Sequence, residues 1–532
     1  MQAAAPSPAT VRSPGAMVAS ADQLATQAGL AVLARSGNAV DAAIATNAAI
    51  AVTGPHLCGM GGDLFALVHD GTGVHALNAS GRAGAGADAE ALRADGHHEM
   101  PFRHDVRTVT VPGCVDGWCS LHARFGRLPL ADVLAPAIRL AADGFPASPL
   151  LVGSLAMVDY RAAEALGELA RQARRPGDRV RRPGVAAALR AVAATGRAGF
   201  YEGAFGEGLL ALGNGWYTAD DLSTPGADWV NPLTSDAFGI TLHTIAPNSQ
   251  GYLLLGSAGL ATNINGSGGI DLPSDPDDPQ WAHLLVECAK AAGRDRPSVL
   301  HDRADGAALL EAIARRGGEI DPGRAAPPVV HHRDGDTTYL CAVDGDRMAV
   351  SLIQSNASGF GSWLVEPTTG INLHNRGLGF SLEPGHPAEL AAGRRPPHTL
   401  APALATRPDG SCAAVFGTMG GDGQPQILLQ LAARLFRHRQ NPAAALDAAR
   451  WVLRGPVTGF DTWTASEGAD LLLEDHVPPF WPAELARLGH RVAMAPAFDS
   501  AFGHAQAIVV QPDGMLAGGT DRRARVGSVA GT

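Results

Sequence analysis

The chain is poor in cysteine, has almost no lysine and lacks any long hydrophobic segment. Six of its 532 residues are cysteines, and no two form the Cys-x-x-C spacing of zinc and redox sites, so we expect buried free thiols. No apolar run approaches the roughly 20 residues that cross a bilayer. The first 14 residues lack the charged start and apolar core of a secretory signal. These absences predict a cytoplasmic protein that has no membrane partner.

Arginine carries nearly all of the positive charge, because Lys290 is the only lysine. Lysine and arginine together number 41 against 52 aspartates and glutamates, which gives a formal net charge of −11. Nucleic-acid binding depends on clustered cations that neutralise phosphates, so an acidic chain without a basic stripe argues against such a partner. The composition, with 46% hydrophobic and 17% charged residues, is that of an ordinary globular protein. The length leaves the number of domains open.

Helical and strand patterns alternate along the chain. Apolar residues at helical spacing predict two helices within residues 23–53, separated at Gly37-Asn38, and a short buried strand follows at residues 64–68. The same spacing predicts further helices at residues 133–144, 185–194 and 281–292. The glycine-rich turn at residues 59–62 does not fit a phosphate-binding loop, because no strand precedes it and no Gly-Lys-Ser/Thr follows.

A change in composition marks the second half of the chain. A helical stretch after Ala304 gives way to a polar, proline-rich segment that ends at Asp336, and we expect an exposed connector there. Residues 337–343 and 348–354 then alternate strand-type side chains around a turn, which predicts a β-hairpin. A break in the chain would be easiest just before this hairpin.

Thr337 and Thr338 open the predicted hairpin, directly after the connector. A threonine hydroxyl is a weak nucleophile. It becomes active when threonine is the first residue of a chain, because its own α-amine, with a reference pKa near ~8, can accept the hydroxyl proton. This activation requires cleavage between Asp336 and Thr337. Threonines at the start of a strand are also ordinary β-formers, so the position alone leaves both interpretations open.

The order of short motifs along the whole chain resembles the gamma-glutamyltransferase family. The small subunit of that family opens with Thr-Thr, followed by a Val-Asp turn, an Ala-Val-Ser strand and a Phe-Gly-Ser segment. The matching residues here are Thr337-Thr338, Val343-Asp344, Ala349-Val350-Ser351 and Phe360-Gly361-Ser362. Other family motifs match in order from Gly37–Ala43 near the start to Gly518-Gly519-Thr520-Asp521 near the end.

The resemblance implies an α/β fold of the N-terminal-nucleophile hydrolase type, a four-layer αββα sandwich made as one precursor. Cleavage between Asp336 and Thr337 would give a large subunit, residues 1–336, and a small subunit, residues 337–532, which together form one domain. The two fragments would stay associated as a heterodimer, and a dimer of these heterodimers is an open alternative. Thr337 would attack an amide carbonyl, and water or an amine acceptor would resolve the acyl-enzyme. No cofactor and no metal is implied.

The resemblance also assigns supporting residues. Gly420 and Gly421 match the paired glycines of the family's oxyanion site, where backbone N–H groups meet the charge that develops on a carbonyl oxygen; a tight turn is the alternative. Ser355 corresponds to a second hydroxyl residue near the nucleophile, or it is a polar residue on a strand face. Arg82 aligns with the arginine that holds a substrate carboxylate, or it is a surface residue.

Several positions depart from the pattern of a γ-glutamyl site. The family motif Asn-Asn-Glu/Gln-Met-Asp-Asp-Phe-Ser, whose second Asp binds the glutamyl α-ammonium, corresponds to His-Asn-Arg-Gly-Leu-Gly-Phe-Ser at residues 374–381. Gly379 stands at the position of that Asp and cannot hold a cation. The family's Ser-Ser pair, which helps to bind the substrate carboxylate, is His398-Thr399 here. We therefore expect Arg376, His398 and Thr399 to contact a different small, amino-acid-derived substrate.

These departures resemble the intracellular, acylase-type branch of the family. The alternatives are a specialised hydrolase of antibiotic or natural-product biosynthesis, including one that cleaves a carbon–carbon bond, and a non-catalytic binding relative that does not cleave itself. A serine hydrolase is disfavoured because no Gly-x-Ser-x-Gly motif is present.

A metal site is also disfavoured on the sequence. Adjacent side chains such as His331-His332 in a polar connector rarely converge on one ion. His283 and Glu287 face one side of a predicted helix, and packing of that helix is the simpler explanation.

Overall fold

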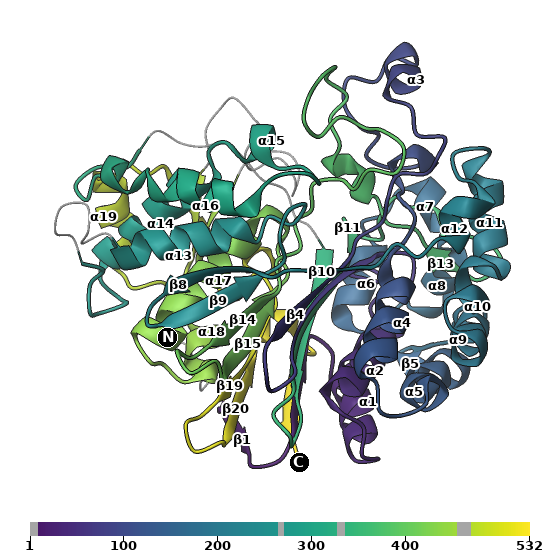
Figure 1. Ribbon diagram of the computed structural model, residues 1–532, viewed down its shortest axis with the longest axis horizontal. Coiled ribbons are helices and arrows are strands. Elements are labelled where there is room, and N and C mark those ends of the chain that lie inside the picture. Colours follow the sequence, from purple (N-terminus) through teal and green to yellow (C-terminus); the bar gives the residue numbers. More distant parts are fainter. Residues whose placement is uncertain (1–8, 264–270, 327–335, 455–469) are drawn as a thin grey trace.

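The computed structural model describes residues 9–263, 271–326, 336–454 and 470–532. Two antiparallel seven-stranded sheets lie at its centre, and helices cover the outer face of each sheet (Figure 1). One sheet consists, in spatial order, of β1 (Val11–Ser13), β20 (Leu516–Thr520), β19 (Ala505–Val510), β15 (Cys412–Thr418), β14 (Ala403–Thr406), β9 (Ile240–Thr244) and β8 (Leu233–Ala237). The other consists of β21 (Ser528–Gly531), β2 (Met17–Ser20), β10 (Asp336–Val343), β11 (Ala349–Ala357), β3 (Asp63–His69), β4 (Val74–Ala79) and β7 (Asp228–Val230). The predicted αββα sandwich is confirmed.

Three hydrophobic cores separate the four layers. Between the sheets, inward-facing side chains such as Tyr339, Ile353 and Val415 are fully buried, as alternation along paired strands requires. A second core joins the β8-to-β1 sheet to its helices, and a third joins the β7-to-β21 sheet to its own.

The β7-to-β21 sheet is covered mainly by helices from the first part of the chain. They are α1 (Gln23–Leu33), α2 (Ala39–Thr53), α3 (Ala89–Ala94), α4 (Cys114–Phe125), α5 (Leu130–Asp143), α6 (Pro149–Leu155), α7 (Tyr160–Ala165), α8 (Gly167–Gln172), α9 (Pro183–Thr195), α10 (Ala198–Tyr201), α11 (Ala204–Gly213) and α12 (Ala219–Ser223). The other sheet is covered by α13 (Tyr252–Asn263), α14 (Pro279–Gly293), α15 (Arg296–Val299), α16 (Gly306–Ala314), α17 (Gln424–Ala432), α18 (Pro442–Asp447) and α19 (Trp481–Arg487). Short strands pair outside the main sheets: β5 (Phe145–Pro146) with β6 (Arg179–Val180), β12 (Val365–Glu366) with β13 (Ile371–Asn372), and β16 (Trp451–Arg454) with β17 (Asp470–Glu474) and β18 (Val492–Ala495).

The two helices predicted within residues 23–53 are confirmed as α1 and α2. Asn38 caps α2: its side chain accepts from the Asp41 N–H, and the Asp41 carboxylate accepts from the Asn38 N–H. Every residue of α2 is buried, because the helix lies between the sheet, α1 and α5. The predicted helices around residues 133–144, 185–194 and 281–292 are confirmed as α5, α9 and α14, and the strand at residues 64–68 as β3.

The predicted hairpin is confirmed as β10 and β11. The Asp344 carboxylate stabilises its turn by accepting from the N–H groups of Asp346 and Met348. Strands β10 and β11 pair with each other and with β2 and β3, which precede them in the chain. Fragments formed by cleavage before Thr337 would therefore interleave their strands in one sheet. The connector residues 327–335, with the predicted His331-His332 pair, lie outside the described residues.

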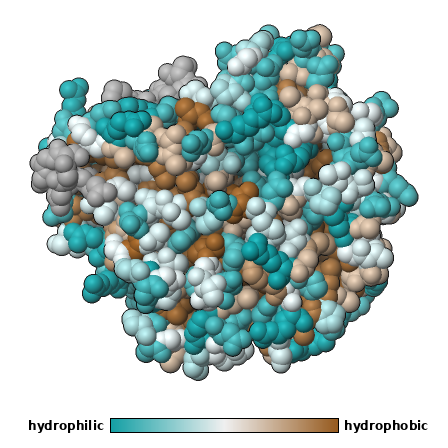
Figure 2. Space-filling view, in the orientation of Figure 1, coloured by the Kyte–Doolittle hydropathy of each residue, from teal (hydrophilic) through white to brown (hydrophobic). Residues whose placement is uncertain are grey.

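The distribution of hydrophobic residues on the surface and the state of the cysteines agree with the expectations from the amino-acid composition. Figure 2 shows hydrophobic residues in scattered patches between hydrophilic ones on this face. All six cysteines are free, and all except Cys119 are buried, which confirms the prediction of free thiols. In the described residues, no helix has the length and hydrophobicity needed to span a membrane.

Candidate active site

Thr337 lies in the second position of β10, where the pairing with β11 is irregular. Asp336 pairs with Ala357 and Thr338 with Gln354, so the register shifts across Thr337. Its side chain is buried, and its Oγ1 donates a hydrogen bond of 3.0 Å to Oγ of Ser355. The structure thus brings the predicted nucleophile and the predicted second hydroxyl residue into direct contact.

Arg376 extends this contact by two further hydrogen bonds. It begins the short 3-10 helix η4 (Arg376–Gly379), and its side chain is buried. One guanidinium nitrogen donates to Ser355 Oγ at 3.2 Å and another donates to Thr399 Oγ1 at 2.9 Å. Burial lowers the pKa of Arg376 to about 10, while Asp63 and Asp422 oppose this shift. The guanidinium therefore remains charged at neutral pH, two hydrogen bonds from the hydroxyl of Thr337.

Gly420 and Gly421 lie where β15 turns into a helix. Their φ angles of 133° and 52° are in the region that glycine adopts most readily. They lead into the 3-10 turn η5 (Gly421–Gly423) and then α17. The first N–H groups of a helix have no intrahelical acceptor and carry the positive end of its dipole, so this position suits a developing anion. Gln250 connects the turn to the arginine site, because its amide donates to the carbonyl oxygens of Gly421 and Thr399.

Asp63 is a buried anion that the sequence analysis did not identify. It starts β3 directly after the glycine-rich turn and pairs in register with Ser355. Its carboxylate accepts from the N–H groups of Gly81 and Gly113 and from the His398 ring. Burial acts to raise its pKa, but His374, His398 and Arg376 hold the pKa at about 2. The available signal was an acidic residue between a glycine-rich turn and a strand of apolar residues.

His398 faces Asp63 rather than a cavity. Its Nε2 lies 3.1 Å from the Asp63 carboxylate, and its Nδ1 accepts from the Leu400 N–H. Burial and the nearby Arg376 lower the pKa of His398 to about 3, so the ring is neutral. Its predicted contact with substrate stays a prediction, because the lining of the cavity described below includes its neighbour Thr399 and not His398.

The two candidate substrate-binding arginines, Arg376 and Arg82, line two separate cavities. Arg376 and Thr399 line a cavity of about 720 Å³ together with Gly379 and Arg296. Arg82 lines a different cavity of about 430 Å³. Its half-exposed side chain donates to the Asp228 carboxylate at 2.7 Å and to the Gly393 carbonyl. The structure does not bring Arg82 into the cavity of Arg376, and its predicted substrate contact stays a prediction.

The backbone closes the position where the family motif has its second Asp. A Cβ atom added to Gly379 would lie 2.3 Å from the carbonyl oxygen of Pro397. Real Cβ atoms do not approach backbone oxygens this closely, so a larger side chain requires the backbone to move. With this backbone, residue 379 cannot carry the carboxylate that the family motif has at this position.

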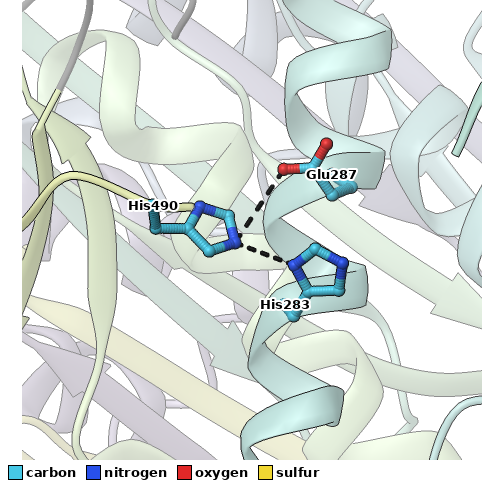
Figure 3. A group of neighbouring side chains, drawn as sticks. All are labelled: His283, Glu287 and His490. Atoms are coloured by element: carbon cyan, nitrogen blue, oxygen red, sulfur yellow. Dashed lines mark hydrogen bonds and ion pairs between the residues drawn. The ribbon is translucent and has the colours of Figure 1, made fainter. Parts of the chain in front are cut away.

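One other buried cluster has metal-ligand chemistry. In the described part of the chain, ligand atoms of His283, Glu287 and His490 lie within 4.8 Å of one another (Figure 3). The ammonium of Lys290, however, lies 2.8 Å from the Glu287 carboxylate and supplies the positive charge. His283 binds His490 at 2.8 Å and the Asp321 carbonyl at 2.9 Å. These contacts support the interpretation that α14 carries packing residues here.

Comparisons with known proteins agree with this geometry. Residues 25–531 match the family described as Gamma-glutamyltranspeptidase. The chain is 37% identical to the oxamate amidohydrolase proenzyme of Klebsiella pneumoniae subsp. pneumoniae, over 97% of this chain and 98% of that protein. It is 34% identical to the glutathione hydrolase-like YwrD proenzyme of Bacillus subtilis, over 95% and 97%. The crystal structure of cephalosporin acylase from Bacillus halodurans superposes with a TM-score of 0.88 at 34% identity, covering 100% of this chain and 98% of that one.

These matches span almost the entire chain and confirm the prediction of an enzyme, a hydrolase or acyltransferase with the N-terminal-nucleophile fold. The chain belongs to the gamma-glutamyltranspeptidase family.

Proposed function

We propose that this protein is a self-cleaving amidohydrolase whose nucleophile is Thr337 and whose substrate is a small amide that carries a carboxylate. The observation that carries the proposal is the buried, hydrogen-bonded row from Thr337 through Ser355 and Arg376 to Thr399, which ends on a cavity of about 720 Å³. In this proposal Thr337 is the nucleophile, Ser355 orients its hydroxyl, and Arg376 supplies the cation for a substrate in the cavity that Arg376 and Thr399 line.

Maturation begins with the peptide bond before Thr337. Its Oγ1 attacks the carbonyl carbon of Asp336, the bond from that carbon to the Thr337 nitrogen breaks, and the hydroxyl proton passes to the nitrogen. Water then hydrolyses the resulting ester, which leaves a carboxylate on Asp336 and a free amine on Thr337. Two observations on Thr337 support this step. The register between β10 and β11 shifts across this residue, and its hydroxyl is hydrogen-bonded to Ser355.

The mature site then uses the new amine. The amine accepts the proton of the Thr337 hydroxyl as the oxygen attacks the substrate carbonyl. The N–H groups of Gly420 and Gly421 stabilise the oxyanion at the start of a helix. The departing nitrogen takes the proton and leaves as ammonia or an amine. Water attacks the acyl-enzyme, which releases the acid and restores the threonine.

Oxamate is the first substrate to test. The relative named oxamate amidohydrolase shares 37% identity with this chain over nearly its full length. Oxamate has a carboxylate next to its amide and no ammonium group, which agrees with the closed position at Gly379 and the cation at Arg376. Cytoplasmic location and a role in natural-product biosynthesis remain predictions from the sequence.

Two measurements test the proposal. Purified protein should separate on a denaturing gel into two fragments, and N-terminal sequencing of the smaller should begin at Thr337. Processed protein should release ammonia from oxamate. A small fragment that begins at another residue would exclude Thr337 as the nucleophile. A single uncleaved band without ammonia release would instead support a non-catalytic relative.

A further inference from the structure

The cavity that Arg376 and Gly379 line, named the acyl pocket from here on, has different charges from those that the family motif at residues 374–381 would give it. The third position of that motif is Glu or Gln and the sixth is Asp, and both supply oxygen acceptors. Here the third position is Arg376 and the sixth is Gly379. The positively charged hydrogen-bond donor Arg376 thus stands where the motif has an acceptor, and Gly379 stands where the motif has the anionic Asp. Such a pocket suits a carboxylate where the family pattern suits an ammonium.

Neighbouring groups fix Arg376 in this role. Ser355 and Thr399 accept hydrogen bonds from its two terminal nitrogens, which sets the plane of the guanidinium. Asp63 lies opposite Ser355 in the sheet and acts electrostatically to keep the arginine protonated. The guanidinium of Arg376 therefore needs little reorganisation when an anion enters the cavity.

The distance from Arg376 to the nucleophile limits the length of the acyl group. Two hydrogen bonds of 3.0 and 3.2 Å join Thr337 Oγ1 to the guanidinium through Ser355 Oγ, so the two ends are no more than about 6 Å apart. A reacting carbonyl carbon lies roughly 3 Å from the attacking oxygen. A substrate that lies between these two ends has its carboxylate close to that carbon. Short acyl groups make both contacts directly, and longer ones must fold between them.

We propose that Arg376 is the carboxylate subsite of the acyl pocket and that it selects half-amides of two- or three-carbon dicarboxylic acids. This inference rests on the proposed function, because it assumes that Thr337 forms the acyl-enzyme. It assigns to Arg376 the carboxylate contact that the family resemblance assigns to Arg82.

A homologous series of substrates tests the length selection. Oxamate, malonamate, succinamate and glutaramate share one amide and one carboxylate and differ only by added methylene groups. Ammonia release by processed wild-type enzyme should give the highest kcat/KM for oxamate or malonamate, and glutaramate should be at least about tenfold poorer. Equal efficiency along the series, or an optimum at glutaramate, would overturn the length selection.

A neutral analogue isolates the charge contact. Pyruvamide replaces the carboxylate of oxamate with a methyl ketone of similar size. Wild-type enzyme should prefer oxamate over pyruvamide by about ten- to a hundred-fold, the value of charge-assisted hydrogen bonds. Arg376→Met should bring this preference close to one, and Arg376→Lys should restore part of it. Arg487→Met, at an exposed arginine of α19, is the matched control that should keep the full preference.

The remaining outcomes separate the two arginines and the two proposals. If Arg82→Met abolishes the preference while Arg376→Met retains it, the subsite lies at Arg82 and the inference is wrong. If Arg376→Met does not self-cleave, inhibition of wild-type enzyme by oxalate, malonate, succinate and glutarate replaces it: inhibition that weakens with length supports the inference, and inhibition independent of length refutes it. Unprocessed wild-type protein that releases no ammonia from any half-amide or from pyruvamide refutes the proposed function itself.

Discussion

Two of the buried polar clusters in the described residues have different surroundings, and of these two only the first has the geometry of an active site. The first joins Thr337, Ser355, Arg376 and Thr399, and its last two residues line a cavity. The second joins His283, Glu287, Lys290 and His490. All four residues of the first cluster follow the predicted cleavage point, whereas the second joins three residues that precede it to His490, which follows it. Histidine, glutamate and lysine are the more familiar catalytic types, yet they belong to the second cluster.

The difference lies in what each cluster faces. The carboxylate of Glu287 accepts from Lys290 and from the N–H of Ala326, and Lys290 also donates to the Ala326 carbonyl. These bonds connect α14 to the segment that precedes the connector. In the first cluster, by contrast, Arg376 and Thr399 line a cavity of about 720 Å³ that can admit a ligand. The comparison teaches that residue type is a weaker guide to chemistry here than the surroundings of the polar atoms.

Removal of the nucleophile should have the largest effect. Thr337→Ala should remain a single chain and lose all amide hydrolysis, because neither self-cleavage nor the acyl-enzyme can form without the hydroxyl. Thr338→Val is the matched control: among the described residues, the buried Thr338 hydroxyl has no hydrogen-bond partner, so its loss should leave processing intact. Gel analysis and ammonia release measure both variants. A processed Thr337→Ala protein would remove this cluster from the mechanism.

Disruption of the second cluster should affect stability and leave chemistry unchanged. Lys290→Met leaves the Glu287 carboxylate buried without its cation, which should cost about 3–5 kcal/mol of unfolding free energy. Thermal unfolding should show the loss, while kcat of the folded, processed enzyme stays at the wild-type value. Adding Glu287→Gln to this variant should recover part of the stability.

An exposed ion pair provides the control for this effect. Arg487 and Glu484 lie on the surface of α19, and Arg487→Met should cost less than about 1 kcal/mol. A large loss of kcat in processed Lys290→Met protein would contradict the assignment of the second cluster to packing.

Sequence reasoning predicted the elements better than the contacts between them. Hydrophobic periodicity and turn residues were sufficient for α1, α2 and the β10–β11 hairpin, because these are local properties. The family resemblance also indicated a hydroxyl residue near Thr337 at Ser355, and the two hydroxyl groups are hydrogen-bonded at 3.0 Å. Asp63 was missed because its partners, such as His398, are remote in sequence and meet it only through sheet register. The separate cavities of Arg82 and Arg376 depend on tertiary packing in the same way.

Asp63 should act as a positioning residue of the first cluster. Asp63→Asn keeps the shape but removes the anion that balances Arg376 and accepts from His398. We expect kcat/KM for oxamate to fall by roughly tenfold or more, the equivalent of a lost charge-assisted contact, with most of the change in KM. Hydrolysis of pyruvamide should fall less, because it needs no arginine contact.

A surface aspartate is the control for Asp63. Asp409 lies in an exposed turn, and Asp409→Asn should leave both substrates unaffected. If Asp63→Asn lowered hydrolysis of oxamate and pyruvamide equally, Asp63 would support the fold in general and not the arginine.

The smallest effect should appear in the dependence of stability on pH. Two buried histidines have a pKa that burial lowers to about 3. His398 lies beside the first cluster, where Arg376 also lowers its pKa, and His490 belongs to the second, where Lys290 and His283 act in the same direction. A depressed folded-state pKa means that the unfolded chain binds the proton first. The stability that each ring contributes is thus fully present above the unfolded pKa near 6.5 and is lost as the pH falls toward about 3. Between pH 7 and 6 the loss of stability for each ring should remain below about 1 kcal/mol, and it should steepen to about 1.4 kcal/mol per pH unit below that.

Thermal midpoints measured from pH 7 to pH 5 should decline less steeply in His398→Gln and in His490→Gln than in the wild type. Only His398→Gln should also lower kcat/KM for oxamate, since the described side chains that His490 contacts are His283 and Glu287 of the second cluster. A wild-type slope in either variant would show that its ring is not held neutral in the folded protein.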